Sequence, residues 1–161
     1  MSTANLLSKN ILQTKSMIES ALADFSEADM MFRPAKTANH AIWQMGHLCN
    51  SVRGMVTMCD SSVTFPFEDD VRFGKSKAAF DDAKFFPNKA ELMGRWNQAM
   101  DIAGAWVARL SDADFAKPTP ERMQKFAPTV AHVAVLLGSH PYMHLGQFQV
   151  SRRALGKPHL M

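Results

Sequence analysis

The sequence has little cysteine and no long hydrophobic run. Cys49 and Cys59 are the only cysteines among 161 residues, and no Cys-x-x-Cys pair is present, so neither a disulfide framework nor a thiolate zinc site is predicted. No stretch approaches the roughly 20 apolar residues of a transmembrane helix. Residues 1–10 also lack the basic and then apolar pattern of a secretory signal. We therefore expect a cytoplasmic protein with no membrane partner.

An excess of charge of one sign is also absent. The 18 Lys and Arg residues and the 15 Asp and Glu residues leave a net charge of +3. The basic residues are scattered, and their densest clusters are the pairs Lys75/Lys77 and Arg152/Arg153. Proteins that bind nucleic acid concentrate basic residues on one face, so we expect no nucleic-acid partner.

The length and composition are those of an ordinary folded domain. A chain of this length can bury a core without disulfides or a structural metal. Hydrophobic residues make up 47% and charged residues 20% of the sequence, which lies outside the range of disordered chains. We therefore predict a single domain over residues 1–161.

Four segments carry apolar residues at three- and four-residue spacing, which is the pattern of amphipathic helices. The clearest pattern contains Leu92, Trp96, Ala99, Ala103, Trp106 and Leu110. The predicted helices run from about Asn5 to Phe25, from Ala38 or Asn39 to about Asp60, from near Asn88 through Leu110, and from Pro128 or Thr129 to about Leu155. A glycine, Gly156, is expected to end the last helix.

The segment from Ser61 to Pro87 has no sustained period and contains six phenylalanines. Large aromatic side chains are costly to leave in water, so we expect this segment to be an ordered loop that packs across the helices and helps to roof a pocket. The sequence therefore predicts an all-α four-helix bundle with a long crossover loop between its second and third helices.

His140 and His144 are the first candidates for chemistry. They lie one helical turn apart, on the same face as Leu136 and Leu137, so both imidazoles point toward the core. Burial favours the neutral form of histidine, which is the form that binds metals. The spacing alone favours a structural pair in the core or a coincidence on the surface, so the metal interpretation needs a further ligand.

His47 is the third candidate. It lies among the small residues Gly46, Ser51 and Gly54, which would leave room beside a ligating ring. It projects almost opposite the main apolar stripe of its helix, so periodicity places it outside the core. The two observations agree if this helix serves two surfaces, one in the bundle and one against a partner subunit.

Three further residues are candidates for supporting roles. Gln147, one turn after His144, could bond the second nitrogen of a ligating histidine, and a packing role fits it equally well. Trp43 and Tyr142 could line the mouth of a pocket. His40 and His132 are expected to be structural or exposed.

Two motifs carry a resemblance to a known family. They are Ile42-Trp43-Gln44-Met45-Gly46-His47-Leu48 and His140-Pro141-Tyr142-Met143-His144-Leu145-Gly146-Gln147. In order and spacing the chain resembles the DinB-like family of bacterial metal-binding four-helix bundles, over its whole length. Pro141 departs from the family pattern and is expected to kink the last helix near Leu137.

The resemblance implies a metal site formed by His47, His140 and His144, with one divalent ion, zinc or nickel, and open coordination positions. Characterised relatives include transferases and isomerases that use a low-molecular-weight thiol, so a metal-dependent enzyme of this type is the first hypothesis for function. No catalytic residue beyond the metal ligands is identified.

Two alternatives remain at this stage. One is a metal-dependent hydrolase, for which the sequence offers no clear general base. The other is a non-catalytic metal-binding dimeric scaffold. A homodimer is expected in any case, because the first two helices carry more apolar surface than one bundle stripe needs; the surplus residues include Met17, Met30, Met31, Met55 and Met58.

Overall fold

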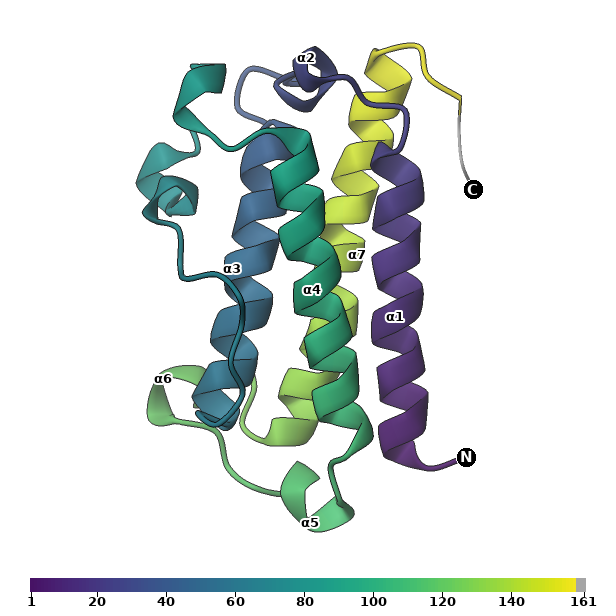
Figure 1. Cartoon of the computed structure of the whole chain (residues 1–161), viewed down its shortest axis with the longest axis vertical. Helices are drawn as coiled ribbons and strands as arrows, with labels where there is room; N and C mark the ends of the chain where they lie inside the picture. Colours follow the sequence, from purple (N-terminus) through teal and green to yellow (C-terminus); the bar gives the residue numbers. More distant parts are fainter. Residues whose placement is uncertain (159–161) are drawn as a thin grey trace.

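The computed structural model describes residues 1–158 and consists of helices and loops, with no β-strand in that range. Four long helices form the body of the molecule (Figure 1). They are α1 (Thr3–Leu22), α3 (Ala41–Cys59), α4 (Lys89–Ala108) and α7 (Val130–Ala154). The predicted all-α four-helix bundle is therefore confirmed, and each helix boundary lies within a few residues of the predicted one.

The long helices pack around a common core in the order α1, α4, α3, α7. Helices α3 and α4 run in the same direction, and α1 and α7 run opposite to them (Figure 1). Because α3 and α4 are parallel neighbours, residues 60–88 must return along the whole length of the bundle before α4 can begin. This segment is the predicted crossover loop. No helix in the described part of the chain is long and apolar enough to cross a membrane.

Short elements that the periodicity did not predict occur in the connections. Helix α2 (Glu27–Met30) joins α1 to α3, while α5 (Asp112–Phe115) and α6 (Glu121–Gln124) join α4 to α7. Three 3-10 turns shape the crossover loop, namely η1 (Val71–Phe73), η2 (Lys75–Lys77) and η3 (Ala83–Phe85). Elements this short contain about one turn each, so no period can reveal them.

The structure explains how α3 buries more than one face. This helix packs against α4, against α7 and against the η1 turn. The ring of Phe73 lies so close to Gly46 that a Cβ atom there would stand 2.3 Å from it. The second buried surface of α3 is therefore supplied within the chain.

The crossover loop is packed unevenly against the bundle. Phe73 and Phe86 are buried at 3% and 6% exposure, as expected for a loop that covers the helices. Phe80 is 40% exposed, so the expectation of burial does not hold for every aromatic residue of the segment. The buried pair packs ring on ring with centroids 5.8 Å apart.

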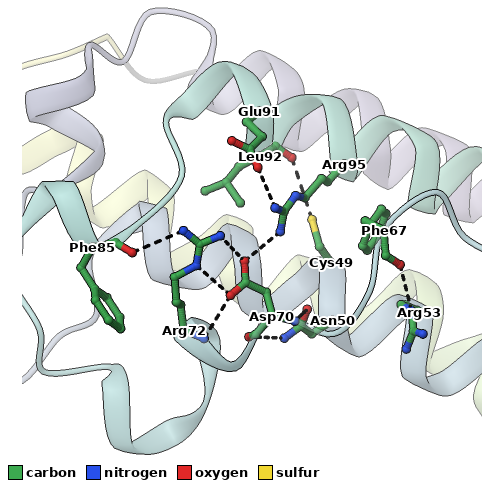
Figure 2. Close-up of polar contacts among 10 residues, drawn as sticks. All are labelled: Cys49, Asn50, Arg53, Phe67, Asp70, Arg72, Phe85, Glu91, Leu92 and Arg95. Atoms are coloured by element: carbon green, nitrogen blue, oxygen red, sulfur yellow. Dashed lines mark hydrogen bonds and ion pairs between the residues drawn. The ribbon is translucent and has the colours of Figure 1, made fainter.

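Asp70 fixes the crossover loop to α4 through its carboxylate and to α3 through its backbone (Figure 2). Arg72 donates to it from Nε and Nη2 at 2.8 and 2.6 Å, and Arg95 of α4 donates from Nη1 at 3.0 Å. The backbone of Asp70 exchanges two hydrogen bonds with the side chain of Asn50 on α3. Burial raises the pKa of the Asp70 carboxyl, but the hydrogen bonds from Arg72 and Arg95 outweigh it and lower the pKa to about 2.

We expect Asp70→Asn to lower the free energy of unfolding at neutral pH by about 2–4 kcal/mol, because Arg72 loses its carboxylate partner and Arg95 keeps that of Glu91 but loses that of Asp70. The folded-state pKa of Asp70 lies below the ordinary value of 3.8. Its stabilising effect is therefore complete above about pH 4 and lost as the pH falls through about 2. Urea unfolding should show the two proteins converging in stability in strong acid.

Asp69→Asn is the matched control, because Asp69 is 64% exposed and its ion pair is with Arg53 at the surface. Its expected effect is below about 0.5 kcal/mol. Equal losses for the two variants would contradict the anchoring role of Asp70.

Candidate metal centre

Three histidines from two antiparallel helices meet in one cluster. His47 comes from α3, whereas His140 and His144 come from α7. One nitrogen of each ring lies within 4.8 Å of the other two, and this group could hold a metal ion. His144 is buried at 7% exposure, and the other two rings are half-buried. The structure thus brings together the three residues that the sequence nominated.

The spacing of the nitrogens fits a shared ion. The Nε2 atoms of His140 and His144 are 3.3 Å apart. Two nitrogens bound to one tetrahedral zinc ion at about 2.1 Å lie about 3.4 Å apart, and such bonds allow at most about 4.2 Å. The widest separation within the cluster, at most 4.8 Å, exceeds the tetrahedral value by about 1.4 Å, so side-chain rotations of this size would bring all three nitrogens to one ion.

Gln44 fixes the tautomer of His144. Its amide Nε2 donates to the backbone oxygen of Asn39 at 2.7 Å, so its Oε1 must face His144. The Nδ1 atom of His144, 2.9 Å away, can bond that oxygen only by donating a proton. The lone pair of His144 therefore lies on Nε2, the atom that faces His140. Gln44, buried at 1% exposure, thus orients the ring of His144 through the nitrogen that does not face the cluster.

The surroundings keep the three imidazoles uncharged at neutral pH. Burial, followed by the charge of His140, lowers the pKa of His47 to about 4 and that of His144 to about 3. Burial also lowers the pKa of His140. Neutral imidazoles are the form that binds metals, so the apolar setting and metal binding require the same protonation state.

Trp43 holds the ring of His47 in place. The two rings are stacked, with centroids 5.1 Å apart and planes 4° from parallel. The indole Nε1 of Trp43 donates to the backbone oxygen of Gly74 in the crossover loop at 3.3 Å. On the other side, the hydroxyl of Ser51 lies 3.5 Å from Nε2 of His47. Trp43 therefore links the loop to a candidate ligand.

A cavity of about 470 Å³ opens beside His140. We call it the methionine cavity, because four methionines contribute to its walls. Its apolar lining residues are Met55, Met58, Met123, Phe126, Leu136 and Met143. The lining residues of this cavity include none from the crossover loop; the α6 region supplies Met123 and Phe126 instead.

Several sequence candidates lie away from the three histidines. Gln147 is on the exposed side of α7, and the hydrogen bond to His144 that it could have supplied comes from Gln44. Tyr142 is half-buried against the core and does not line the methionine cavity. His40 caps α3 by accepting from the backbone N–H of Trp43 at 3.0 Å, and His132 is exposed; both fit the predicted structural or exposed roles.

The cysteines are not part of the cluster. Both are free thiols, and burial raises the pKa of Cys49 to about 12, so this thiol stays protonated at neutral pH.

Sequence reasoning missed Gln44 as the orienting residue. The available signal was its position inside the Trp43 to His47 motif, one turn before His47.

These features define a class of protein: a four-helix bundle in which two antiparallel helices present three histidines beside an apolar cavity. The DinB superfamily matches residues 10–148, and the chain belongs to this superfamily. The fold is similar to the crystal structure of the conserved protein of locus from Enterococcus faecalis, with a TM-score of 0.75 and 17% sequence identity over 98% of this chain and 99% of that chain. No curated protein matches the chain.

We expect Gln44→Met to release the tautomer of His144, because methionine fills similar space but cannot accept the Nδ1–H proton. In the metal-free protein, ¹⁵N NMR should show His144 as the Nδ1–H form in the native chain and a mixture of tautomers in the variant. Gln147→Met, an exposed change on α7, is the matched control and should leave the His144 signals as they are in the native protein. An unchanged His144 signal in Gln44→Met would refute the assignment.

Proposed function

We propose that the protein binds one divalent ion, zinc or nickel, through His47, His140 and His144, and that it is a transferase or isomerase that uses a low-molecular-weight thiol. The histidine cluster supports the first half of the proposal. The second half rests on the charge of the donor set and on its apolar setting, together with the likeness of the motifs to those of thiol-dependent relatives.

The charge of the donor set is the observation that carries the proposal. Three neutral imidazoles leave both positive charges of a divalent ion uncompensated, and no carboxylate joins the cluster within residues 1–158. The ammonium group of Lys75 acts on His47 as a further positive charge. An anionic fourth ligand is therefore favoured, and a thiolate is a soft anion that suits zinc.

The chain's own residues have supporting roles in this proposal. A bound ion supplies Lewis acidity, which lowers the pKa of a coordinated thiol. Gln44 and Trp43 hold two of the ligands in fixed orientations, which limits reorganisation during the reaction. The apolar side chains beside His140 would contact the hydrocarbon part of a bound substrate. The thiol proton leaves to solvent, so no protein nucleophile is needed.

The alternatives fit the site less well. Hydrolysis needs a general base near the attacking water, and the cluster offers none of the usual carboxylates. A purely structural zinc site is usually closed by four protein ligands, and three are found here. A homodimer stays a prediction; two of the methionines that suggested it, Met30 and Met55, are buried within the chain.

Metal content tests the first half of the proposal. Protein prepared without a histidine tag should carry about one zinc or nickel ion per chain by elemental analysis, and the double variant His140→Ala/His144→Ala should lose it, because one remaining imidazole binds an ion weakly. His132→Ala, an exposed change on the same helix, is the control and should keep the ion. Metal retained by the double variant would place the binding site elsewhere.

Cobalt substitution tests the thiol. Adding cysteine or glutathione to the Co²⁺-loaded protein should produce a sulfur-to-cobalt charge-transfer absorption, because the thiolate takes the open coordination position.

A reaction assay tests transfer of the thiol. With monochlorobimane as electrophile, a C–S bond forms, the C–Cl bond breaks and chloride leaves. The zinc- or nickel-loaded protein should speed this reaction at least about tenfold, a barrier change of about 1.4 kcal/mol.

The double histidine variant is the control for both measurements and should show neither signal. A metal-loaded protein that gives no absorption change with several small thiols would contradict the thiol half of the proposal and leave the metal half intact.

A further inference from the structure

We infer that the methionine cavity is the subsite for an apolar group of the substrate, whose polar end reaches the three histidines. The inference rests on the proposed function and adds a substrate class to it: a compound with an unbranched or aromatic hydrocarbon portion next to its metal-binding atom. His140 joins the two parts, because it belongs to the histidine cluster and also lines the cavity.

The cavity offers little polar recognition. Its lining includes the polar side chains of Asn50 and Ser51, but both have partners. The amide of Asn50 is bonded to the backbone of Asp70 through both its nitrogen and its oxygen. The hydroxyl of Ser51 lies 3.5 Å from Nε2 of His47. Apart from His140, the remaining walls are apolar. A ligand in the cavity would therefore gain binding free energy mainly by burying hydrocarbon.

The methionines make the walls adaptable. Thioether side chains are unbranched and flexible, so they fit occupants of different shape and contact aromatic rings favourably. Two large apolar side chains at the cavity, Phe126 and Met143, are 62% and 63% exposed. Exposed apolar side chains that gather around a concavity are typical of binding sites. These features favour a range of hydrocarbon groups over a single shape.

The size of the cavity is that of a ligand site. A volume of about 470 Å³ falls within the roughly 300–1,000 Å³ of small-molecule pockets. A second copy of the chain is the other conceivable occupant of an exposed apolar surface. The concave shape and the continuity with His140 favour a small ligand that spans both the cavity and the histidines.

Alkyl hydroxamates test the inference, because they chelate zinc through two oxygens and carry tails of chosen length. Calorimetry with the zinc-loaded protein would compare acetohydroxamic acid with hexanohydroxamic acid. Each buried methylene improves affinity about fourfold, so four extra methylenes should tighten binding at least about 50-fold. Equal affinities for the two compounds would overturn the inference.

A pocket-filling variant separates the cavity from the metal centre. A Cβ atom at Gly54 would meet nothing within 4 Å, and Gly54 lines the cavity, so Gly54→Leu should fold and fill the space. It should remove most of the gain from the longer tail and leave the affinity for acetohydroxamic acid unchanged. Gly94→Leu is the matched control, because Gly94 has equally open space on α4 and does not line the cavity; it should bind as the native protein does.

The outcomes distinguish the two proposals. If neither hydroxamate binds because the protein takes up no zinc, the proposed function fails; the apolar dye 8-anilinonaphthalene-1-sulfonate, which needs no metal, then tests the cavity alone. Loss of dye binding in Gly54→Leu but not in Gly94→Leu supports an apolar subsite. Sedimentation that shows a native dimer and a monomeric Gly54→Leu variant, with unchanged ligand affinity, would assign the surface to a second copy and overturn the inference.

Discussion

The ionic contact between Asp70 and the arginines Arg72 and Arg95 is the interaction on which the geometry of the histidine cluster depends. It holds the start of the η1 turn against α4, and the backbone of Asp70 is bonded to Asn50 of α3 (Figure 2). The η1 turn places Phe73 over Gly46. The next residue, Gly74, accepts the indole proton of Trp43, whose ring supports His47. The crossover loop returns the chain to the start of α4. Through these contacts it also sets the position of His47, a candidate metal ligand.

The cluster itself combines an apolar setting with very few polar contacts. Burial keeps each imidazole in its neutral form, with a single N–H, at neutral pH. The hydrogen bond to Gln44 places that N–H of His144 on Nδ1. The direct contacts that hold the rings come from the uncharged residues Gln44, Ser51 and Trp43. The same setting places no negative charge in the cluster, and this is the basis for the anionic fourth ligand in the proposed function.

The sequence predicted the parts of the structure that obey a helical period. The four long helices follow from apolar stripes, and His140 and His144 share a face because they are four residues apart. The placement of His47 could not be predicted from one stripe, because α3 is enclosed by α4, α7 and the η1 turn together. Gln44 carries no pattern that marks it, and the methionine cavity depends on Met123 and Phe126, which lie in a connection without a period.

The distribution of the three histidines along the chain determines when the cluster can form during synthesis. His140 and His144 belong to α7, which is translated after α1, α3 and α4 and then packs against both α1 and α3. A nascent chain without α7 offers the single imidazole of His47, and its core is still open. Closure of the bundle and assembly of the cluster are therefore one event. The group that could hold a metal ion is therefore a feature of the folded protein and not of the nascent chain.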